Sequence, residues 1–399
     1  MFQTIQPAPP DSILGLTEAY RADPNPAKIN LAVGVFKDAK GQTPVLTSVK
    51  AAEQRLVDAE TTKSYMPISG SPAYGKLVQA MLFGENHDIL TQQRARTAAT
   101  PGGTGGLRVA ADYLKQNHPD ATVWLSDPTW ANHHGIFNAA GIKTQTYAYL
   151  DPHTNTMDFD GVIAAIQRLP AGDVVLLHGC CHNPTGVDPT QTQWQTIAQT
   201  VAKRGVLPLV DFAYQGFGEG IEPDAAGLRA VAAACEELLV CSSFSKNFGL
   251  YRERVGAFTA VAADAATADA VFSQVKAVIR RNYSNPPAHG SEVVSIILTD
   301  EKLRVQWEAE LAAMRDRIHE MRSAFKAGLD ERGLQLTPQG NGFVTQQNGM
   351  FTMSGLSKDQ VAKLREEHAI YIVGSGRINV AGMTPTNLPV LCDAIAVVF

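Results

Sequence analysis

Lys246 is the residue best placed to do covalent chemistry. It lies in the segment Ser242–Arg254, between two apolar runs, 238–241 and 255–261, that each predict a buried strand. Partial burial at a strand end and the nearby cation Arg254 both favour the neutral, nucleophilic form of the lysine amine. A neutral lysine forms Schiff bases with carbonyls, and the serines and arginine around it suit a phosphate. Together these properties indicate pyridoxal phosphate (PLP), although a solvated loop lysine beside ordinary turn serines explains the same stretch.

A glycine-rich run, Thr100–Gly106, follows one predicted strand and opens a predicted helix. Its glycines let backbone N–H groups turn toward an anion, and a helix N-terminus adds partial positive charge there. The spacing is not that of the dinucleotide fingerprint, because Arg108 stands where a third glycine is required. Gly103 and Thr104 are therefore candidates for a phosphate cradle, with a tight turn as the open alternative.

An acidic residue, Asp211, ends the apolar run 206–210. A carboxylate at the end of a buried strand needs a cationic or hydrogen-bonding partner to stay ionised. A protonated pyridine nitrogen would supply that partner, and Tyr214, three residues later, is within reach of the ring hydroxyl. The competing interpretation is that Asp211 caps the next helix.

The segment His178–Asn183 follows another apolar run and combines histidines with two adjacent cysteines. Adjacent cysteines cannot easily both reach one tetrahedral ion, and no second Cys/His pair has ligand spacing, so we predict no metal site. Asn183 precedes a proline, which fixes an extended turn and directs the amide side chain outward. Trp130, at the end of a further predicted strand, either stacks on a flat ring or simply packs.

Two further stretches carry a cation among glycines. Arg377, between glycines and a predicted strand, is well placed to hold a carboxylate bidentately, although alone it also fits a surface charge. The stretch Gly70–Leu77 nearly matches the phosphate loop of nucleotide hydrolases. It ends in a leucine, which has no hydroxyl for magnesium, and no buried strand precedes it, so we reject that function and expect a helix from Pro72.

These candidate residues belong to an alternation of short strands and helices between about residues 94 and 260. Seven β-rich runs are expected to form strands: Arg96–Ala99, Thr122–Leu125, Lys143–Tyr147, Val174–Leu177, Val206–Val210, Leu238–Cys241 and Val255–Ala260. Helical patterns fall between them, near 105–117, 132–140, 158–168, 189–204 and 224–236. The alternation predicts an α/β fold with a mostly parallel sheet, in which ligands bind at the carboxyl ends of the strands.

The flanking regions predict a second unit. A short strand is expected within Ala27–Val35 and a helix over 47–59. Apolar residues in steps of four and three predict a long helix over Asp300–Arg332, bridging two domains: Trp307, Leu311, Met314, Ile318, Met321 and Phe325. Beyond it, strands near 350–354 and 377–381 and a helix near 357–369 predict a separate α+β lobe.

Composition excludes several classes of protein. The chain has 399 residues, of which 45% are hydrophobic and 18% charged, as in a soluble globular protein. A net charge of -5 without a basic cluster argues against nucleic-acid binding. No secretory signal is evident at the N-terminus, and no apolar run approaches the roughly 20 residues that span a membrane. Five cysteines, two of them adjacent, suit reduced thiols in the cytoplasm.

Four sequence words occur in an order that resembles the fold-type I PLP enzymes, specifically the aspartate/aromatic aminotransferase family and within it the bacterial aspartate branch. The words are His182–Gly186, Asp211–Gly216, Ser243–Phe248 and Asn282–Pro287. The resemblance covers nearly the whole chain. It implies a large domain with a mostly parallel sheet over residues 47–310, and a small α+β domain formed by 1–46 and 311–399.

The resemblance also implies roles for cofactor-binding residues. Lys246 matches the Schiff-base lysine and proton shuttle, Asp211 the partner of the pyridine nitrogen, and Trp130 the stacking aromatic. The residues matching the partners of the ring oxygen are Asn183 and Tyr214. Those matching the phosphate binders are Gly103, Thr104, Ser243, Arg254 and, from the other subunit, Tyr65.

The substrate-binding residues implied in the same way are arginines. Arg377, with Gly34 nearby, matches the clamp on the α-carboxylate. Arg280 matches the arginine that reaches across a homodimer to the side-chain carboxylate, and its neighbour Arg281 is the alternative. The implied reaction moves an amino group between L-aspartate and 2-oxoglutarate, with an aromatic amino-acid aminotransferase as the alternative.

Several pocket residues favour the aspartate branch over the aromatic one: Val35, Lys37, Thr43, Thr104 and Asn285. Ser64 matches the usual residue of neither branch, which leaves the breadth of specificity open. The rival functions are a nucleotide hydrolase or dehydrogenase, and a ligand-sensing module fused to a DNA-binding segment. The chain has neither the length nor the basic charge for that segment.

Overall fold

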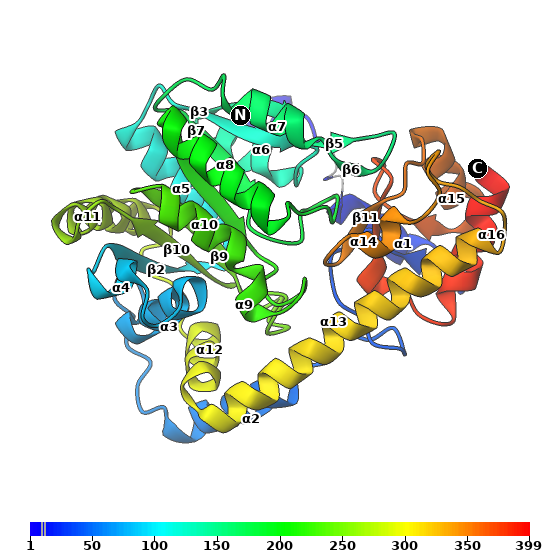
Figure 1. Cartoon of the computed structure of the whole chain (residues 1–399). Helices are drawn as coiled ribbons and strands as arrows, with labels where there is room; N and C mark the ends of the chain where they lie inside the picture. Colours follow the sequence, from blue (N-terminus) through cyan, green and yellow to red (C-terminus); the bar gives the residue numbers. More distant parts are fainter. Residues whose placement is uncertain (9–10, 12) are drawn as a thin grey trace.

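The computed structural model, which describes residues 1–8, 11 and 13–399, contains a seven-stranded sheet. The sheet and its helices lie on the left in Figure 1, and the C-terminal lobe lies on the right. From edge to edge the strands are β2 (Ala95–Pro101), β10 (Val255–Val261), β9 (Leu238–Ser243), β8 (Leu207–Phe212), β7 (Val174–His178), β3 (Thr122–Asp127) and β4 (Lys143–Ala148). β10 runs antiparallel to β2 and β9, and the remaining neighbours are parallel. The predicted mostly parallel α/β sheet is confirmed, with all seven expected strands in it.

Helices cover both faces of this sheet because its central strands are apolar on both sides. In β7, Val174 and Leu176 belong to one core cluster, and Val175 and Leu177 to another. The first cluster is closed by α5 (Gly102–Asn117), α6 (Asn132–Ala139) and α11 (Ala265–Asn282); the second is closed by α7 (Phe159–Ile166), α8 (Gln191–Arg204) and α10 (Ala226–Ala234). A third cluster joins α3 (Pro72–Phe83) and α12 (His289–Thr299) to the sheet.

One continuous helix, α13 (Glu301–Asp330), leads from the sheet region to the C-terminal lobe (Figure 1). Its 30 residues span about 45 Å at 1.5 Å per residue. All six apolar residues that predicted this helix are buried. Next to its first half lies α2 (Thr47–Ala59), whose first two N–H groups donate to the Glu310 carboxylate.

The C-terminal lobe is built from both ends of the chain. β11 (Phe351–Met353) pairs antiparallel with β13 (Arg377–Asn379), and β1 (Ile29–Asn30) pairs parallel with β12 (Ile370–Tyr371). The lobe's helices are α1 (Leu14–Ala22), α14 (Phe343–Gln346), α15 (Lys358–His368) and α16 (Asn387–Val398), with the 3-10 turn η2 (Val380–Gly382). The strand expected within Ala27–Val35 is confirmed only at β1, because the polypeptide after Asn30 leaves the two-stranded sheet as a loop.

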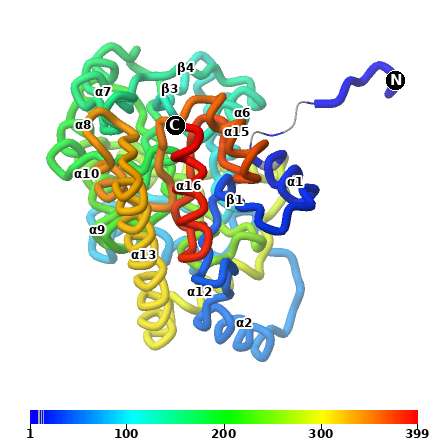
Figure 2. Tube along the Cα trace, turned by 90° about the vertical axis from the view of Figure 1, so that its right-hand side faces the viewer, coloured from blue at the N-terminus to red at the C-terminus, as the bar shows by residue number. Residues whose placement is uncertain are grey.

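The remaining elements are short. They are η1 (Phe2–Thr4), α4 (Asp88–Thr91), the hairpin of β5 (Leu150–Asp151) and β6 (Thr156–Met157), and α9 (Ile221–Asp224). Residues 1–8 are exposed, and Figure 2 shows them standing away from the remainder of the chain. Within the described residues, no helix combines the length and the apolarity that crossing a bilayer requires.

Candidate active site

A cavity of about 370 Å³ opens where the carboxyl ends of the sheet strands meet the C-terminal lobe. Its walls bring together residues from the ends of the sheet strands, from the loop that follows β1, and from β13. Eleven of the residues predicted for the site line it: Gly34, Gly103, Thr104, Trp130, Asn183, Asp211, Tyr214, Ser243, Lys246, Arg254 and Arg377. The residues that were selected because they follow strand ends therefore lie together in one cavity.

Two predicted site residues lie outside this cavity. Tyr65 belongs to an extended segment and is 94% exposed. Arg280 is exposed in the last turn of α11, where its guanidinium contacts Ser284. The neighbouring Arg281 contacts Gln116 instead. Within a single chain, none of these three side chains reaches the residues that line the cavity.

Lys246 follows β9 in a loop that the surrounding residues hold firmly. Its amine lies 4.6 Å from the centre of the Tyr214 ring. Burial lowers the pKa of Lys246 to about 8; Asp211 opposes this shift, while the nearby cations favour it. On the next residue, the Asn247 carbonyl oxygen accepts the indole N–H of Trp307 at 2.7 Å, and that indole stacks on Phe248. The solvated-lysine interpretation is wrong, because the amine is enclosed and its neutral form is favoured.

Asp211 is the second-last residue of β8, and α9 begins only at Ile221. The interpretation of Asp211 as a helix cap is therefore wrong. Its Oδ2 lies 2.9 Å from Nε2 of His133, and the Nδ1 of His133 lies 2.8 Å from the Thr129 hydroxyl. Burial by itself would raise the pKa of Asp211, but the hydrogen bond with His133 and nearby cations, including Lys246, bring it below its ordinary value. The carboxylate is thus kept ionised inside the cavity.

Anion-binding groups collect at the start of α5. This helix begins at Gly102, whose φ is +74°, and a Cβ there would overlap the Arg254 guanidinium. The same guanidinium donates to the Ser245 hydroxyl at 3.3 Å. Ser243, at the end of β9, faces Gly103. The glycine run therefore makes a tight turn and also places backbone N–H groups, hydroxyls and a cation around one space.

Arg377 stands at the other side of the cavity, at the start of β13, and is only 4% exposed. It donates to Asn183 Oδ1 at 3.0 Å and to the Ala32 carbonyl at 2.6 Å, and its buried Nε has no partner in the described chain. Burial lowers the pKa of Arg377 to about 10. The surface-charge interpretation is therefore wrong. Arg377 is a buried cation whose hydrogen-bond acceptors in the described part of the chain are neutral, and it has donor capacity to spare for a carboxylate.

Sequence reasoning missed Phe351, which lines the same cavity from β11. The Arg377 guanidinium carbon lies 4.2 Å from the centre of its ring, and Tyr214 meets the ring edge-on. A Cβ on Gly34 would overlap this ring, which explains the glycine at that position. Nothing in the sequence marked Phe351 as a site residue, because an aromatic residue in a short predicted strand is expected to pack in the hydrophobic core.

Trp130 lines the same cavity as Asp211 and the start of α5. Its ring is perpendicular to that of His133, with the ring centres 5.3 Å apart. The indole therefore packs on one side against the histidine that holds Asp211. Both alternatives proposed for it from the sequence, packing and stacking on a ligand ring, are compatible with this position.

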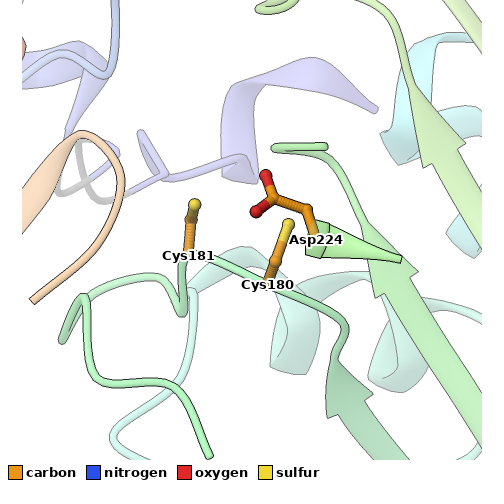
Figure 3. Close-up of side chains that lie close together, drawn as sticks. All are labelled: Cys180, Cys181 and Asp224. Carbon is orange, nitrogen blue, oxygen red and sulfur yellow. The ribbon is translucent and has the colours of Figure 1, made fainter. Parts of the chain in front are cut away.

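The adjacent cysteines lie beside Asp224, and all three side chains are buried (Figure 3). The carboxylate oxygens of Asp224 already accept backbone N–H groups of Gly216, Gly218 and Glu219 at 2.7–2.9 Å. Burial raises the pKa of the Cys180 and Cys181 thiols, which opposes the thiolate form that a metal requires. A metal ion would have to displace three hydrogen bonds and two protons, so we assign none here.

Comparison with known proteins identifies the class to which this fold and cavity belong. The family model "Aminotransferase class I and II" matches residues 26–395. The chain therefore belongs to the class I and II aminotransferases, and the resemblance predicted from the four sequence words is confirmed.

Individual relatives match along their whole length. The aspartate aminotransferase of Escherichia coli (strain K12) is 57% identical over 398 residues, covering 100% of both chains. An aromatic-amino-acid aminotransferase of Pseudomonas aeruginosa is 47% identical over 395 residues, covering 99% of this chain and 98% of that protein. The crystal structure of the Burkholderia pseudomallei aromatic-amino-acid aminotransferase, covalently bound to pyridoxal phosphate, has a TM-score of 0.96 at 45% identity, with 100% and 99% covered.

Proposed function

We propose that this chain is a PLP-dependent aminotransferase that moves an amino group between L-aspartate and 2-oxoglutarate. The observation that carries the proposal is the enclosed Lys246 amine, with a pKa of about 8, in one cavity with an ionised acid and two arginines. The Escherichia coli relative, at 57% identity, is an aspartate aminotransferase. The Burkholderia relative carries PLP covalently.

The residues of the cavity fit PLP. The α5 N-terminus, the Ser243 hydroxyl and Arg254, all at the cavity wall, suit its phosphate. Asp211 suits the ring nitrogen, because its low pKa keeps the charge that a protonated nitrogen needs. When bound, PLP would supply an electron sink, which accepts the electron pair left on the substrate Cα when its proton is removed.

The chain's own groups perform the proton transfers and hold the ring. Lys246 would take the proton from the substrate Cα as a neutral amine and, as an ammonium group, would deliver it to the cofactor's aldehyde carbon. Tyr214 and Asn183 hold the ring oxygen, and Trp130 covers one face of the ring. Burial raises the pKa of Tyr214, so its hydroxyl donates a hydrogen bond at neutral pH.

Two arginines select a dicarboxylate substrate. Arg377 holds the α-carboxylate with its unused donors, and Gly34 leaves room beside it. Arg280 of the partner subunit holds the side-chain carboxylate, and Tyr65 of the partner subunit reaches the phosphate. The exposure of both residues in a single chain supports a homodimer in which each active site is shared. The exposed apolar arm with Phe2 and Ile5 supports the same assembly.

We also propose two domains joined by α13, a large one over 47–310 and a small one formed by 1–46 and 311–399. The Glu310 carboxylate supports this boundary, because it holds the N-terminus of α2 where the chain crosses between them. The cytoplasm is the proposed compartment. All five cysteines are free and buried, which supports it.

An aromatic preference is the second candidate. The 47% identity to a Pseudomonas aromatic-amino-acid aminotransferase favours it, and it shares all the cofactor chemistry. The test for both is an absorbance spectrum of the purified protein, followed by steady-state rates with aspartate, glutamate, phenylalanine and tyrosine. A protein without cofactor absorbance and without amino transfer would overturn the proposal, and a higher kcat/KM for phenylalanine or tyrosine would replace it with the aromatic one.

A further inference from the structure

Arg322 of α13 is a buried cation whose hydrogen-bond partners among the described residues are all backbone carbonyls. It is 1% exposed, deep under the C-terminal lobe. Its Nη1 donates to the carbonyl of Val344 at 2.9 Å. Its Nη2 lies within 3.1 Å of the carbonyls of Asn348, Gly349 and Phe351. The partners found for it in the described chain thus all belong to the turn 344–351, and its Nε has none.

A charged guanidinium is a costly way to satisfy these carbonyls. Burial lowers the pKa of Arg322 to about 10, and no carboxylate within the described residues forms an ion pair with it. A neutral donor would avoid the desolvation cost, but no neutral side chain offers the five N–H donors with which a guanidinium reaches four carbonyl oxygens. The geometry of the turn 344–351 is therefore what this residue determines.

That turn is joined to a second one from the sheet. The Asn348 N–H donates to the Gly186 carbonyl at 2.7 Å, and its side-chain amide donates to Asp188 Oδ2 at 3.3 Å. Asp188 in turn accepts the backbone N–H groups of Cys181 and His182 at 2.8 and 2.9 Å. The turn 181–188 is therefore connected to Arg322 through Asn348.

Both turns carry a residue that contacts the guanidinium of Arg377. The turn 344–351 delivers the Phe351 ring, whose centre lies 4.2 Å from the Arg377 guanidinium carbon. The turn 181–188 delivers Asn183, whose Oδ1 accepts from Arg377 at 3.0 Å. Two of the neutral contacts that orient Arg377 thus depend on one residue of the long helix.

We propose that Arg322 is a positioning residue for the carboxylate clamp: it fixes Phe351 and Asn183, and through them the orientation of Arg377. This inference rests on the proposed role of Arg377 in holding the α-carboxylate. Every amino acid and 2-oxo acid substrate carries that group, so Arg322 serves all of them alike. A defect here weakens binding of every substrate by a similar factor, whatever the side chain.

The test is Arg322→Lys in the complete holoenzyme, since lysine keeps the charge but cannot reach four carbonyls. The expected result is about a tenfold rise in KM for aspartate, 2-oxoglutarate and phenylalanine alike, with kcat within about twofold. Calorimetric titration with succinate, which does not react, should show a similar loss of affinity. The matched control is Arg315→Lys, on the same helix, where Nη1 reaches a single carbonyl, that of Gly216; its KM values should stay unchanged.

A double-mutant cycle with Phe351→Leu separates positioning from stability. If Arg322 acts through Phe351, the two changes in succinate affinity are less than additive. Additive losses, or unchanged KM with only a lower melting temperature, would overturn the inference. Arg377→Lys distinguishes a failure of this inference from a failure of the proposed role of Arg377. If Arg377 does not hold the carboxylate, Arg377→Lys leaves succinate affinity unchanged. A loss with Arg377→Lys but none with Arg322→Lys overturns the inference alone.

Discussion

The amine of Lys246 lies 4.6 Å from the ring centre of Tyr214, and both residues line one cavity with Asp211. Lysine and tyrosine come from successive strand ends, β9 and β8, whose parallel pairing brings them together. An aromatic face stabilises an ammonium group, whereas burial disfavours it, and burial dominates here because the pKa of Lys246 is lowered to about 8. The amine is therefore available as a nucleophile and as a base near neutral pH.

Lys246→Ala should retain cofactor and lose amino transfer. The phosphate and ring contacts remain, while the base that moves the Cα proton is gone, so kcat should fall by at least about a thousandfold. Borohydride reduction followed by peptide mapping should label Lys246 in the wild-type chain. Lys76→Ala, which alters the stretch that resembles a nucleotide phosphate loop, is the control and should keep full activity. A borohydride label on another lysine would contradict the assignment.

The reactivity of Lys246 should depend on pH in a characteristic way. In the cofactor-free protein its neutral fraction should rise through about pH 8 and level off, whereas an ordinary lysine titrates near 10.5. At pH 7 the neutral fraction should exceed that of an ordinary lysine by about 300-fold. The measurement is the rate of reductive labelling with pyridoxal at a series of pH values. A labelling rate that still rises steeply above pH 9 would contradict it.

The same shift has a consequence for stability. Between about pH 8 and 10.5 the unfolded chain holds the Lys246 proton and the folded cofactor-free chain does not. The free energy of unfolding should therefore gain a positive slope with pH in that window. Denaturant unfolding of the cofactor-free wild-type and Lys246→Met proteins at pH 7.5 and 10 measures this slope. Equal changes in both proteins would show that Lys246 contributes none of it.

Asp211→Asn should impair both catalysis and cofactor retention. The neutral amide cannot stabilise a protonated ring nitrogen, so kcat should fall by at least about a hundredfold and cofactor should dissociate more readily. The matched control is Asp173→Asn, a buried aspartate that accepts the indole N–H of Trp124 and does not line the cavity. That variant should lose stability but keep kcat. Normal turnover of Asp211→Asn with full cofactor would remove Asp211 from the mechanism.

Much of this arrangement could be predicted from the sequence, because parallel sheets leave a strong pattern. Each of the seven strands coincides with a short β-rich run, and parallel strands place their carboxyl ends at one edge. Gly103, Asp211 and Lys246 follow three such runs, and the structure places all three in one cavity. The spacing of apolar residues was equally informative for α13, whose apolar face is buried as expected.

Other features were beyond the sequence because their cause lies in tertiary contacts. Arg322 follows Met321 on the buried side of α13, where a charge contradicts the apolar pattern, and only the turn 344–351 explains it. The helices α11 and α12 were not assigned from the sequence, since α11 buries few residues and α12 follows a Pro-rich turn. The roles proposed for Tyr65 and Arg280 require a second subunit, which no pattern within one chain reveals.

Sharing of the active site between subunits can be tested with mixed dimers. Dimers made of the Lys246→Ala chain alone, or of the Arg280→Leu chain alone, should have low activity with aspartate. In a mixed dimer, the intact Lys246 of one chain meets the intact Arg280 of the other, which rebuilds one complete site. Unfolding and refolding an equal mixture should restore about a quarter of the wild-type sites. If Arg280 acts within its own chain, mixing restores no activity.

The last prediction concerns substrate preference. A bidentate pair between Arg280 and a side-chain carboxylate is a strong contact in a partly desolvated site, whereas an aromatic ring leaves the arginine unpaired. An unpaired buried charge costs about 3–5 kcal/mol, which sets a ceiling of several hundredfold or more on discrimination. Arg280 is exposed in the single chain, so it is able to swing toward water, and this flexibility lowers the cost.

Arg280→Leu should therefore reduce kcat/KM for aspartate by on the order of a hundredfold and for phenylalanine by no more than about threefold. The neighbouring Arg281→Leu is the matched control, because both arginines lie in the last turn of α11 and only one is expected to reach the substrate. Its kcat/KM for aspartate should stay within about twofold of wild type. A selective loss with Arg281→Leu instead would transfer the role to that residue. Equal losses for both substrates in Arg280→Leu would mean that this arginine supports the fold or the dimer and does not select the substrate.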